Sequence, residues 1–171
     1  MGKKSTKENK NIYQITREAL DLTRDQASEV LQFISADRIE KIENEKAMAH
    51  PDEVLTMAEG YRKPNLCNYY CSHECPIGEK YVPEVESKEL SGIVLEMLAS
   101  LNSMNKMKER LIEITADGMI SDDELLDFIT IQQELEKISL SVESLQLWME
   151  STIANKQIDS AKIEKLKASC K

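Results

Sequence analysis

The sequence predicts an all-α protein, and three observations lead to this prediction. Leu, Ile and Met dominate the hydrophobic residues, which make up 41% of the 171-residue chain, whereas aromatic residues make up 5%. With 5 Gly and 4 Pro, the residues that favour strands and turns are scarce. Apolar residues also recur at spacings of three and four, which is the pattern of amphipathic helices.

Residues 12–64 are predicted to form a compact domain of four or five short helices. The starts of three helices are marked by capping signals: Thr23 with Gln26, Ser35, and Pro51 at a first helical position. The apolar residues expected to face inward are Ile12, Ile15, Ala19, Leu20, Ala27, Val30, Leu31, Ile39, Ile42, Val54, Leu55 and Ala58.

Two further regions follow this domain. Residues 65–86 are predicted to be a linker rich in Cys and Tyr with one short helix, because Pro64, Pro76 and Pro83 interrupt the segment. Residues 87–171 are predicted to form a long antiparallel helical hairpin and a last short helix. The second long helix, expected from Ser121, carries a heptad-like seam of Phe128, Ile131, Leu135, Ile138, Val142, Leu145 and Met149.

That seam predicts an assembly, because two helices alone bury little apolar surface. We expect a homodimer through the C-terminal helices, and the alternative is that the seam packs against the N-terminal domain of the same chain.

The stretch LTRDQASEVLQFISADRIEKIENEK, residues 22–46, resembles the helix-turn-helix family of Cro and the phage repressors, the XRE-like group. Leu22 and Thr23 introduce the second helix, and Ser28 is the small residue at the helix crossing. Ile39 and Ile42 correspond to the inward residues of the recognition helix. The turn, QFIS, departs from the family pattern in lacking its Gly and in being one residue longer.

The resemblance implies sequence-specific binding of double-stranded DNA and transcriptional regulation by a dimer on a two-fold symmetric site. Arg38 is the candidate for reading guanine, and Arg24, Lys41 and Lys46 are candidates for phosphate contacts. The exposed face of the recognition helix would comprise Ala36, Asp37, Arg38, Glu40 and Lys41. A basic, disordered arm at residues 1–11 would follow the DNA backbone.

The charge distribution restricts where nucleic acid could bind. The chain has 22 Lys and Arg against 31 Asp and Glu, a net charge of −9. Through Lys63 there are 11 bases and 12 acids, which leaves 11 bases and 19 acids for the remainder. Nucleic-acid affinity is therefore expected only in the N-terminal third. The two carboxylates on the recognition face favour an alternative, a protein-interaction adaptor or antitoxin-like component that uses the fold without binding DNA.

The stretch CNYYCSHECPIG contains a second group of candidate residues: Cys67, Cys71, Cys75 and His73. A straight helix would separate Cys67 and Cys75 by about 12 Å, too far for one zinc ion, so a metal site needs a bend near Cys75. The spacing matches no common zinc or iron–sulfur signature. No cofactor is expected, and the cysteines are predicted to pack between the two halves. Zinc, an iron–sulfur cluster or a redox-sensing role are the alternatives.

The remaining motifs point away from catalysis. Residues 113–124 resemble half of an EF-hand loop, but Ser121 with Glu124 also reads as a helix cap, which we favour. No phosphate-binding loop or nucleophile motif occurs, so no enzyme is predicted. The absence of an export signal or membrane span predicts a cytoplasmic protein that does not contact membranes.

Overall fold

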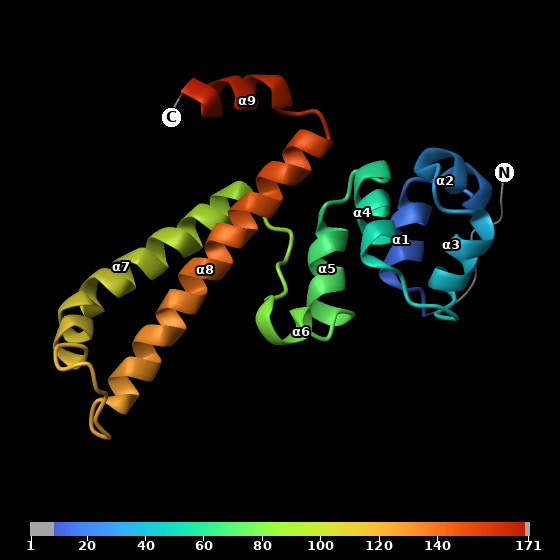
Figure 1. Ribbon diagram of the computed structural model, residues 1–171. Coiled ribbons are helices and arrows are strands. Elements are labelled where there is room, and N and C mark those ends of the chain that lie inside the picture. Colours follow the sequence, from blue (N-terminus) through green and yellow to red (C-terminus); the bar gives the residue numbers. More distant parts are fainter. Residues whose placement is uncertain (1–8, 170–171) are drawn as a thin grey trace. The chain divides into compact units, whose positions relative to one another are not determined.

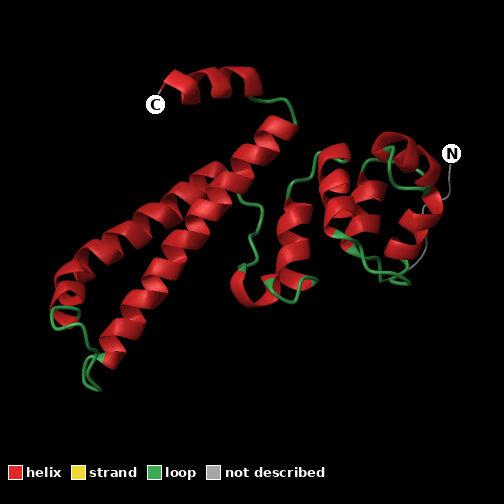
Figure 2. Ribbon diagram, in the orientation of Figure 1, coloured by secondary structure: helices red, strands yellow, loops and turns green. Residues whose placement is uncertain are grey.

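The computed structural model describes residues 9–169, and every regular element in that range is a helix (Figures 1 and 2). The predicted all-α class is confirmed for this part of the chain. The helices are α1 (Ile12–Ala19), α2 (Arg24–Leu31), α3 (Ala36–Glu43), α4 (Pro51–Gly60), α5 (Asn65–His73), α6 (Gly78–Tyr81), α7 (Leu90–Ile114), α8 (Leu125–Ala154) and α9 (Ser160–Ser169). Most of the predicted basic arm, residues 1–8, lies outside the described residues.

The chain divides into two compact units. The first contains the residues up to Glu84 together with those from Glu150 onward, and the second is Val85–Met149. No helix in the described range is both long and apolar enough to cross a membrane.

The predicted helix starts in the first unit are confirmed. Thr23 and Gln26 form a reciprocal capping box, in which each side chain accepts a hydrogen bond from the other residue's backbone N–H. The Ser35 hydroxyl accepts from the N–H of Arg38 at 3.2 Å and caps α3. Pro51 is the first residue of α4, a position at which a backbone N–H would have no hydrogen-bond partner within the helix, so the N–H that proline lacks is not needed.

One apolar core unites α1 to α5. Its buried residues are Tyr13, Ala27, Leu31, Ile34, Ile39, Ile42, Ala49, Val54, Met57, Ala58, Tyr61 and Leu66. Of the residues predicted to face inward on α1, Ile12 packs against this core, but Ile15, Ala19 and Leu20 are exposed. Helix α1 instead buries Tyr13, Gln14, Thr16 and Arg17. Arg17 turns this face inward because its guanidinium bonds to a carboxylate in the interior.

Residues 65–86 contain two helices, whereas the sequence predicted a linker with one. Pro64 occupies the N-cap position of α5, where it does not interrupt the helix, and Leu66 enters the core. After α5 the chain turns back and approaches this helix so closely that a Cβ on Gly78 would lie 1.9 Å from the carbonyl oxygen of Cys71. Only glycine fits there, so α6 packs against α5, and the segment as far as Glu84 belongs to the first unit.

The second unit is built on α7 and α8, which run in opposite directions from the connection at residues 115–124 (Figure 1). Arg110 Nε donates to Asp127 Oδ2 at 2.7 Å, so the end of α7 lies against the start of α8. Helix α8 begins at Leu125, four residues later than predicted. The backbone N–H of Ser121 donates to the Glu124 carboxylate at 3.0 Å, which is one half of the predicted capping box.

Candidate nucleic-acid interface

Helices α2 and α3 are joined by a strained turn at residues 32–35. Gln32 has φ 58° and ψ −43°, and the N–H of Phe33 donates to the carbonyl of Leu31 at 2.6 Å. This is a γ-turn of the rare form with positive φ, which costs energy for any residue with a Cβ. The next side chain, Phe33, is 88% exposed. Gln32 therefore has a backbone conformation that glycine adopts more easily.

Helix α3 presents two chemically different faces. Ile39, Ile42 and Glu43 are buried, as the sequence predicted for the two isoleucines. On the outer face, Asp37, Glu40 and Lys41 are exposed, and Ala36 and Arg38 are half-buried. Both outward carboxylates of α3 thus lie on the face that the resemblance assigns to DNA.

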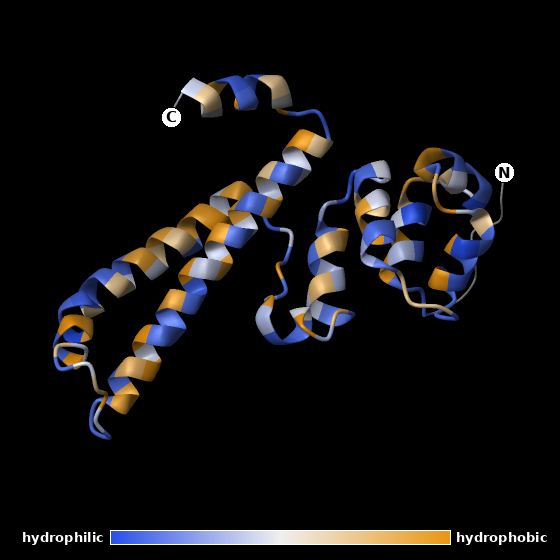
Figure 3. Cartoon of the chain, viewed as in Figure 1, coloured by the Kyte–Doolittle hydropathy of each residue, from blue (hydrophilic) through white to orange (hydrophobic). Residues whose placement is uncertain are grey.

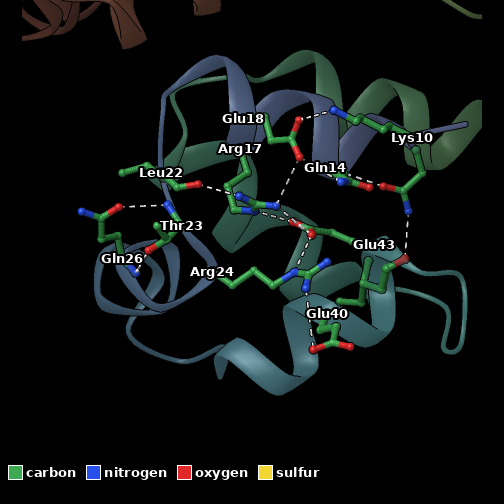
Figure 4. A network of polar contacts seen from close by, with 12 residues as sticks. Lys10, Gln14, Arg17, Glu18, Leu22, Thr23, Arg24, Gln26, Glu40 and Glu43 are labelled. Carbon is green, nitrogen blue, oxygen red and sulfur yellow. Dashed lines mark hydrogen bonds and ion pairs between the residues drawn. The ribbon is translucent and has the colours of Figure 1, made fainter. Parts of the chain in front are cut away.

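Glu43 lies at the centre of an ion-pair network between α1, α2 and α3 (Figure 4). Arg17 donates to both of its carboxylate oxygens, at 2.5 and 2.9 Å, and Arg24 Nε donates to Oε2 at 2.8 Å. Burial works against the charge of Arg17, but the bonds to Glu43 prevail and raise the pKa of this guanidinium. Two cations sharing one buried carboxylate fix the orientation of α2 and α3.

The sequence missed Glu43 as an organising residue, since it reads as an ordinary helix-surface acid. The one signal that could have found it is its position, one residue after Ile42 on the inward side of α3. Arg24, predicted to contact phosphate, is therefore held by Glu43 and lies 3.6 Å from a carboxylate oxygen of Glu40.

Arg38, the predicted guanine-reading residue, is bound to Glu53 of α4. Its Nε and Nη2 donate to the two carboxylate oxygens at 2.6 and 2.7 Å, and Nη2 also donates to the Met48 carbonyl at 2.8 Å. These bonds raise the pKa of Arg38, and they lower the pKa of Glu53. Both Nε and Nη2 are thus engaged within the protein, which leaves Nη1 as the end of the guanidinium for an external acceptor.

The other predicted DNA-contacting cations differ in their surroundings. Lys41 forms an ion pair with Asp37 at 2.7 Å, one helical turn earlier. Lys46 follows α3 and is exposed. Lys10 donates to Glu18 at 2.6 Å, and this bond is the main reason that the pKa of Glu18 is lowered. The structure brings Arg24, Glu40 and Glu43 together and keeps Arg38 in a separate pair.

The cysteine group lies on α5 and just after it. Cys67, Cys71 and Cys75 are free thiols and half-buried, and Cys67 packs against the core of the first unit. Burial raises the pKa of the Cys67 thiol, which favours the protonated form. Within the described residues, no three His, Cys, Asp or Glu side chains are placed to hold one metal ion.

His73 is occupied by contacts other than a metal. Its ring stacks on Tyr69 with centroids 4.5 Å apart, and Nε2 lies 3.5 Å from a carboxylate oxygen of Glu84. Nearby, the Tyr13 hydroxyl donates to Glu74 Oε2 at 3.0 Å, across 61 residues of sequence. Burial raises the pKa of Glu74 and that of Tyr13. No local sequence signal predicts this pair.

The half EF-hand stretch forms a turn and a cap. The Asp117 carboxylate accepts from the N–H of Met119 at 2.9 Å, and Gly118 adopts φ 75°. Glu124 is bonded to Ser121, so the two acidic positions serve the connection between α7 and α8.

No family model, curated protein or solved structure matches this chain.

Proposed function

We propose that residues 12–64 form a helix-turn-helix domain of the Cro and phage-repressor type and that the protein is a sequence-specific DNA-binding transcriptional regulator. In this proposal α3 enters the major groove, and a homodimer through α7 and α8, arranged as an antiparallel hairpin, places two such helices on a two-fold symmetric site.

The observation that supports DNA binding is the construction of the α2–α3 pair. Helix α3 is capped by Ser35, is anchored by Ile39, Ile42 and Glu43, and exposes Asp37, Glu40 and Lys41 on its outer face. A recognition helix needs this combination, because base reading requires exposed side chains on a helix whose orientation is fixed.

Arg38 is the residue that would read a base. Glu53 holds two of its nitrogens, so the plane of the guanidinium is set before DNA arrives. Such a brace lowers the entropy lost on binding, but it also restricts the donors that remain for guanine. Arg24 and Lys46 would contact phosphates on either side of the groove.

A second function, protein recognition by the same face, is favoured by one specific observation. Arg24, Arg38 and Lys41 each pair with a carboxylate of the chain itself, so these cations are already neutralised. A partner protein with a few complementary groups would fit such a mixed-charge helix, and this is the adaptor or antitoxin-like alternative.

Selection of bound sequences from a random duplex pool, followed by fluorescence anisotropy, tests the proposal. Arg38→Ala should weaken binding to the selected duplex by about 1–3 kcal/mol and relax the preference at one base pair. Lys63→Ala is the matched control, because Lys63 is an exposed cation of the same unit outside α2 and α3. If the intact protein selects no sequence and binds no duplex at low salt, DNA binding is refuted and the adaptor function takes its place.

A further inference from the structure

Helix α8 carries two apolar rows, where the sequence suggested one seam. The inward row is Ile131, Ile138 and Leu145, of which Ile131 is fully buried and the others half-buried. The outward row is Phe128, Leu135, Val142 and Met149, in which Leu135 is 46% and Val142 41% exposed and the two end residues are half-buried. Both rows have heptad spacing, so each forms a continuous stripe along α8.

Helix α7 has a matching division. Ile93 and Ile114 are buried and mark its inward side. Its exposed apolar row is Leu90, Val94, Leu98 and Leu101, at spacings of four, four and three. At 3.6 residues per turn, the centre of this row lies about 120° around the axis of α7 from its inward side. On α8, the outward row lies about 50° around the axis from the inward row, in the same rotational sense.

The two exposed rows lie on the same side of the helix pair. Two antiparallel helices are related by a half-turn about an axis perpendicular to the plane that contains them. This rotation keeps the handedness of the helix and leaves each side of the plane unchanged. Rows that are displaced in the same rotational sense from the two inward sides therefore lie on the same side of the helix pair. The opposite flank of α7 carries Glu96, Ser103, Lys106 and Arg110. Figure 3 shows the alternation of apolar and polar residues along both helices. We call the two exposed rows together the apolar face.

We propose that the apolar face binds the apolar face of a second copy of this chain, which gives a four-helix bundle in which α7 of each copy packs against α8 of the other. This surface specifies the dimer of the proposed function, but its formation does not depend on DNA.

The length of the apolar face points to a second copy as the partner. The outward row of α8 extends about 32 Å and the row of α7 about 17 Å, at 1.5 Å per residue. The other helices in the described range have at most 10 residues, or about 15 Å. Within the described residues, a single chain therefore offers no other helix long enough to cover both rows, whereas the row of α8 in a second copy is long enough to cover the whole row of α7.

The charges decide between the two symmetric arrangements of such a bundle. Helix α8 has five carboxylates and one lysine, a net charge of −4, whereas α7 has three carboxylates and three cations, a net charge of 0. Glu136, Glu143 and Glu150 follow the outward row of α8 at heptad spacing. Placing α8 against α8 would align these glutamates with each other, so packing α8 against α7 of the second copy avoids the repulsion.

This arrangement has a geometric consequence. When α7 faces α8 of the other copy, the two-fold axis runs along the bundle, and both connections at residues 115–124 lie at one end. Both chains then enter α7 at the same opposite end, as a pair of DNA-binding domains on one two-fold site requires.

Light scattering of the full chain, with variants in and outside the apolar face, tests the surface. We expect a dimer at micromolar concentration, and we expect Leu135→Asp to give a monomer of unchanged helicity. Leu126→Asp is the matched control, because Leu126 is a 74% exposed leucine of α8 outside the apolar face, and it should leave the dimer intact.

Milder variants keep the test decisive if an aspartate unfolds the unit. Leu135→Ala and Leu98→Ala should each raise the dimer dissociation constant at least tenfold, and Leu126→Ala less than twofold. A monomeric wild-type protein, or equal effects of the three substitutions, would overturn the proposal. A dimer that binds no DNA duplex would refute the proposed function but would still support this interface.

The arrangement is tested by one distance. A spin label introduced at Asp117 as an unnatural amino acid leaves the native cysteines in place and marks the connection in each copy. Pulsed electron resonance should give a label separation below about 25 Å, whereas α8 against α8 would place the labels at opposite ends, more than about 35 Å apart for a helix of this length. The longer distance overturns the α7–α8 pairing.

Discussion

Arg38 and Glu53 form a two-bond ion pair between α3 and α4, with nitrogen–oxygen distances of 2.6 and 2.7 Å. The same arginine is the candidate for base recognition. This side chain holds two helices together, and in the proposed function it would also read a base, so that it would couple the stability of the domain to DNA binding.

The first prediction concerns this pair and pH. Because Arg38 lowers the pKa of Glu53 in the folded protein, the stabilisation is present above the unfolded value of about 4.3 and is lost as pH falls through the folded pKa. Glu53→Gln should therefore cost about 1–3 kcal/mol at pH 7, with a difference from wild type that shrinks below about pH 4. Urea unfolding followed by circular dichroism measures it.

Glu59→Gln is the control, since Glu59 is an exposed acid on the same helix. A difference that persists unchanged at low pH would show that the effect of Glu53→Gln does not come from its charge.

The second prediction concerns Glu43. Glu43→Gln leaves Arg17 and Arg24 without their shared carboxylate, and Arg17 has a side-chain exposure of only 8%. Breaking a buried pair in this way should cost about 3–5 kcal/mol. Arg24→Gln should cost about 1 kcal/mol, because Arg24 is partly exposed and Arg17 still pairs with Glu43. Equal losses for the two variants in urea unfolding would contradict the central role of Glu43.

The third prediction concerns the turn between α2 and α3. Gln32→Gly should stabilise the protein by about 1 kcal/mol, because the relief of strain at φ 58° exceeds the entropy that glycine adds to the unfolded chain. Gln32→Ala keeps the strain and should change the stability little. A thermal midpoint that is lower for the glycine variant than for the alanine variant would count against strain at this position.

The fourth prediction concerns Glu74. Burial raises its folded pKa, so the charged form destabilises the folded state, and the penalty is relieved as pH falls through the folded pKa towards the unfolded value. Glu74→Gln keeps an acceptor for Tyr13 and should be more stable than wild type at pH 7, by a fraction of a kcal/mol because the group is partly exposed. The advantage should vanish near pH 4, and an advantage independent of pH would argue against the desolvation cause.

Local signals predicted the local structure well. The Thr23–Gln26 box, the Ser35 cap and Pro51 mark helix starts that the structure confirms, because caps act within three residues. Pro64 led to the wrong prediction of a linker, because a proline that ends one helix can also begin the next, and α5 follows it directly. The inward face of α1 was missed because a buried arginine reads as a surface residue.

Ion pairs and hydrogen bonds between residues far apart in the sequence could not be predicted from local sequence patterns. Arg38–Glu53 and Tyr13–Glu74 join side chains from different helices, and their partners follow from packing geometry. The sequence identified the apolar seam of α8. It did not show which residues of the seam are buried, such as Ile131, and which are exposed, such as Leu135, because this depends on where α7 lies. Of the five residues expected on the outer face of α3, three are exposed and Ala36 and Arg38 are half-buried, and the sequence did not predict the ion pairs of Arg38 and Lys41.

The division into two units gives each one its own optical signature. All 5 tyrosines, from Tyr13 to Tyr81, belong to the first unit, and the single tryptophan, Trp148, lies on α8 in the second. Fluorescence excited at wavelengths that tyrosine does not absorb therefore reports on α8 alone, while the near-ultraviolet dichroism contains the tyrosine signal of the first unit. Following both signals through one denaturant titration distinguishes a chain that unfolds as a whole from one that loses its second unit first.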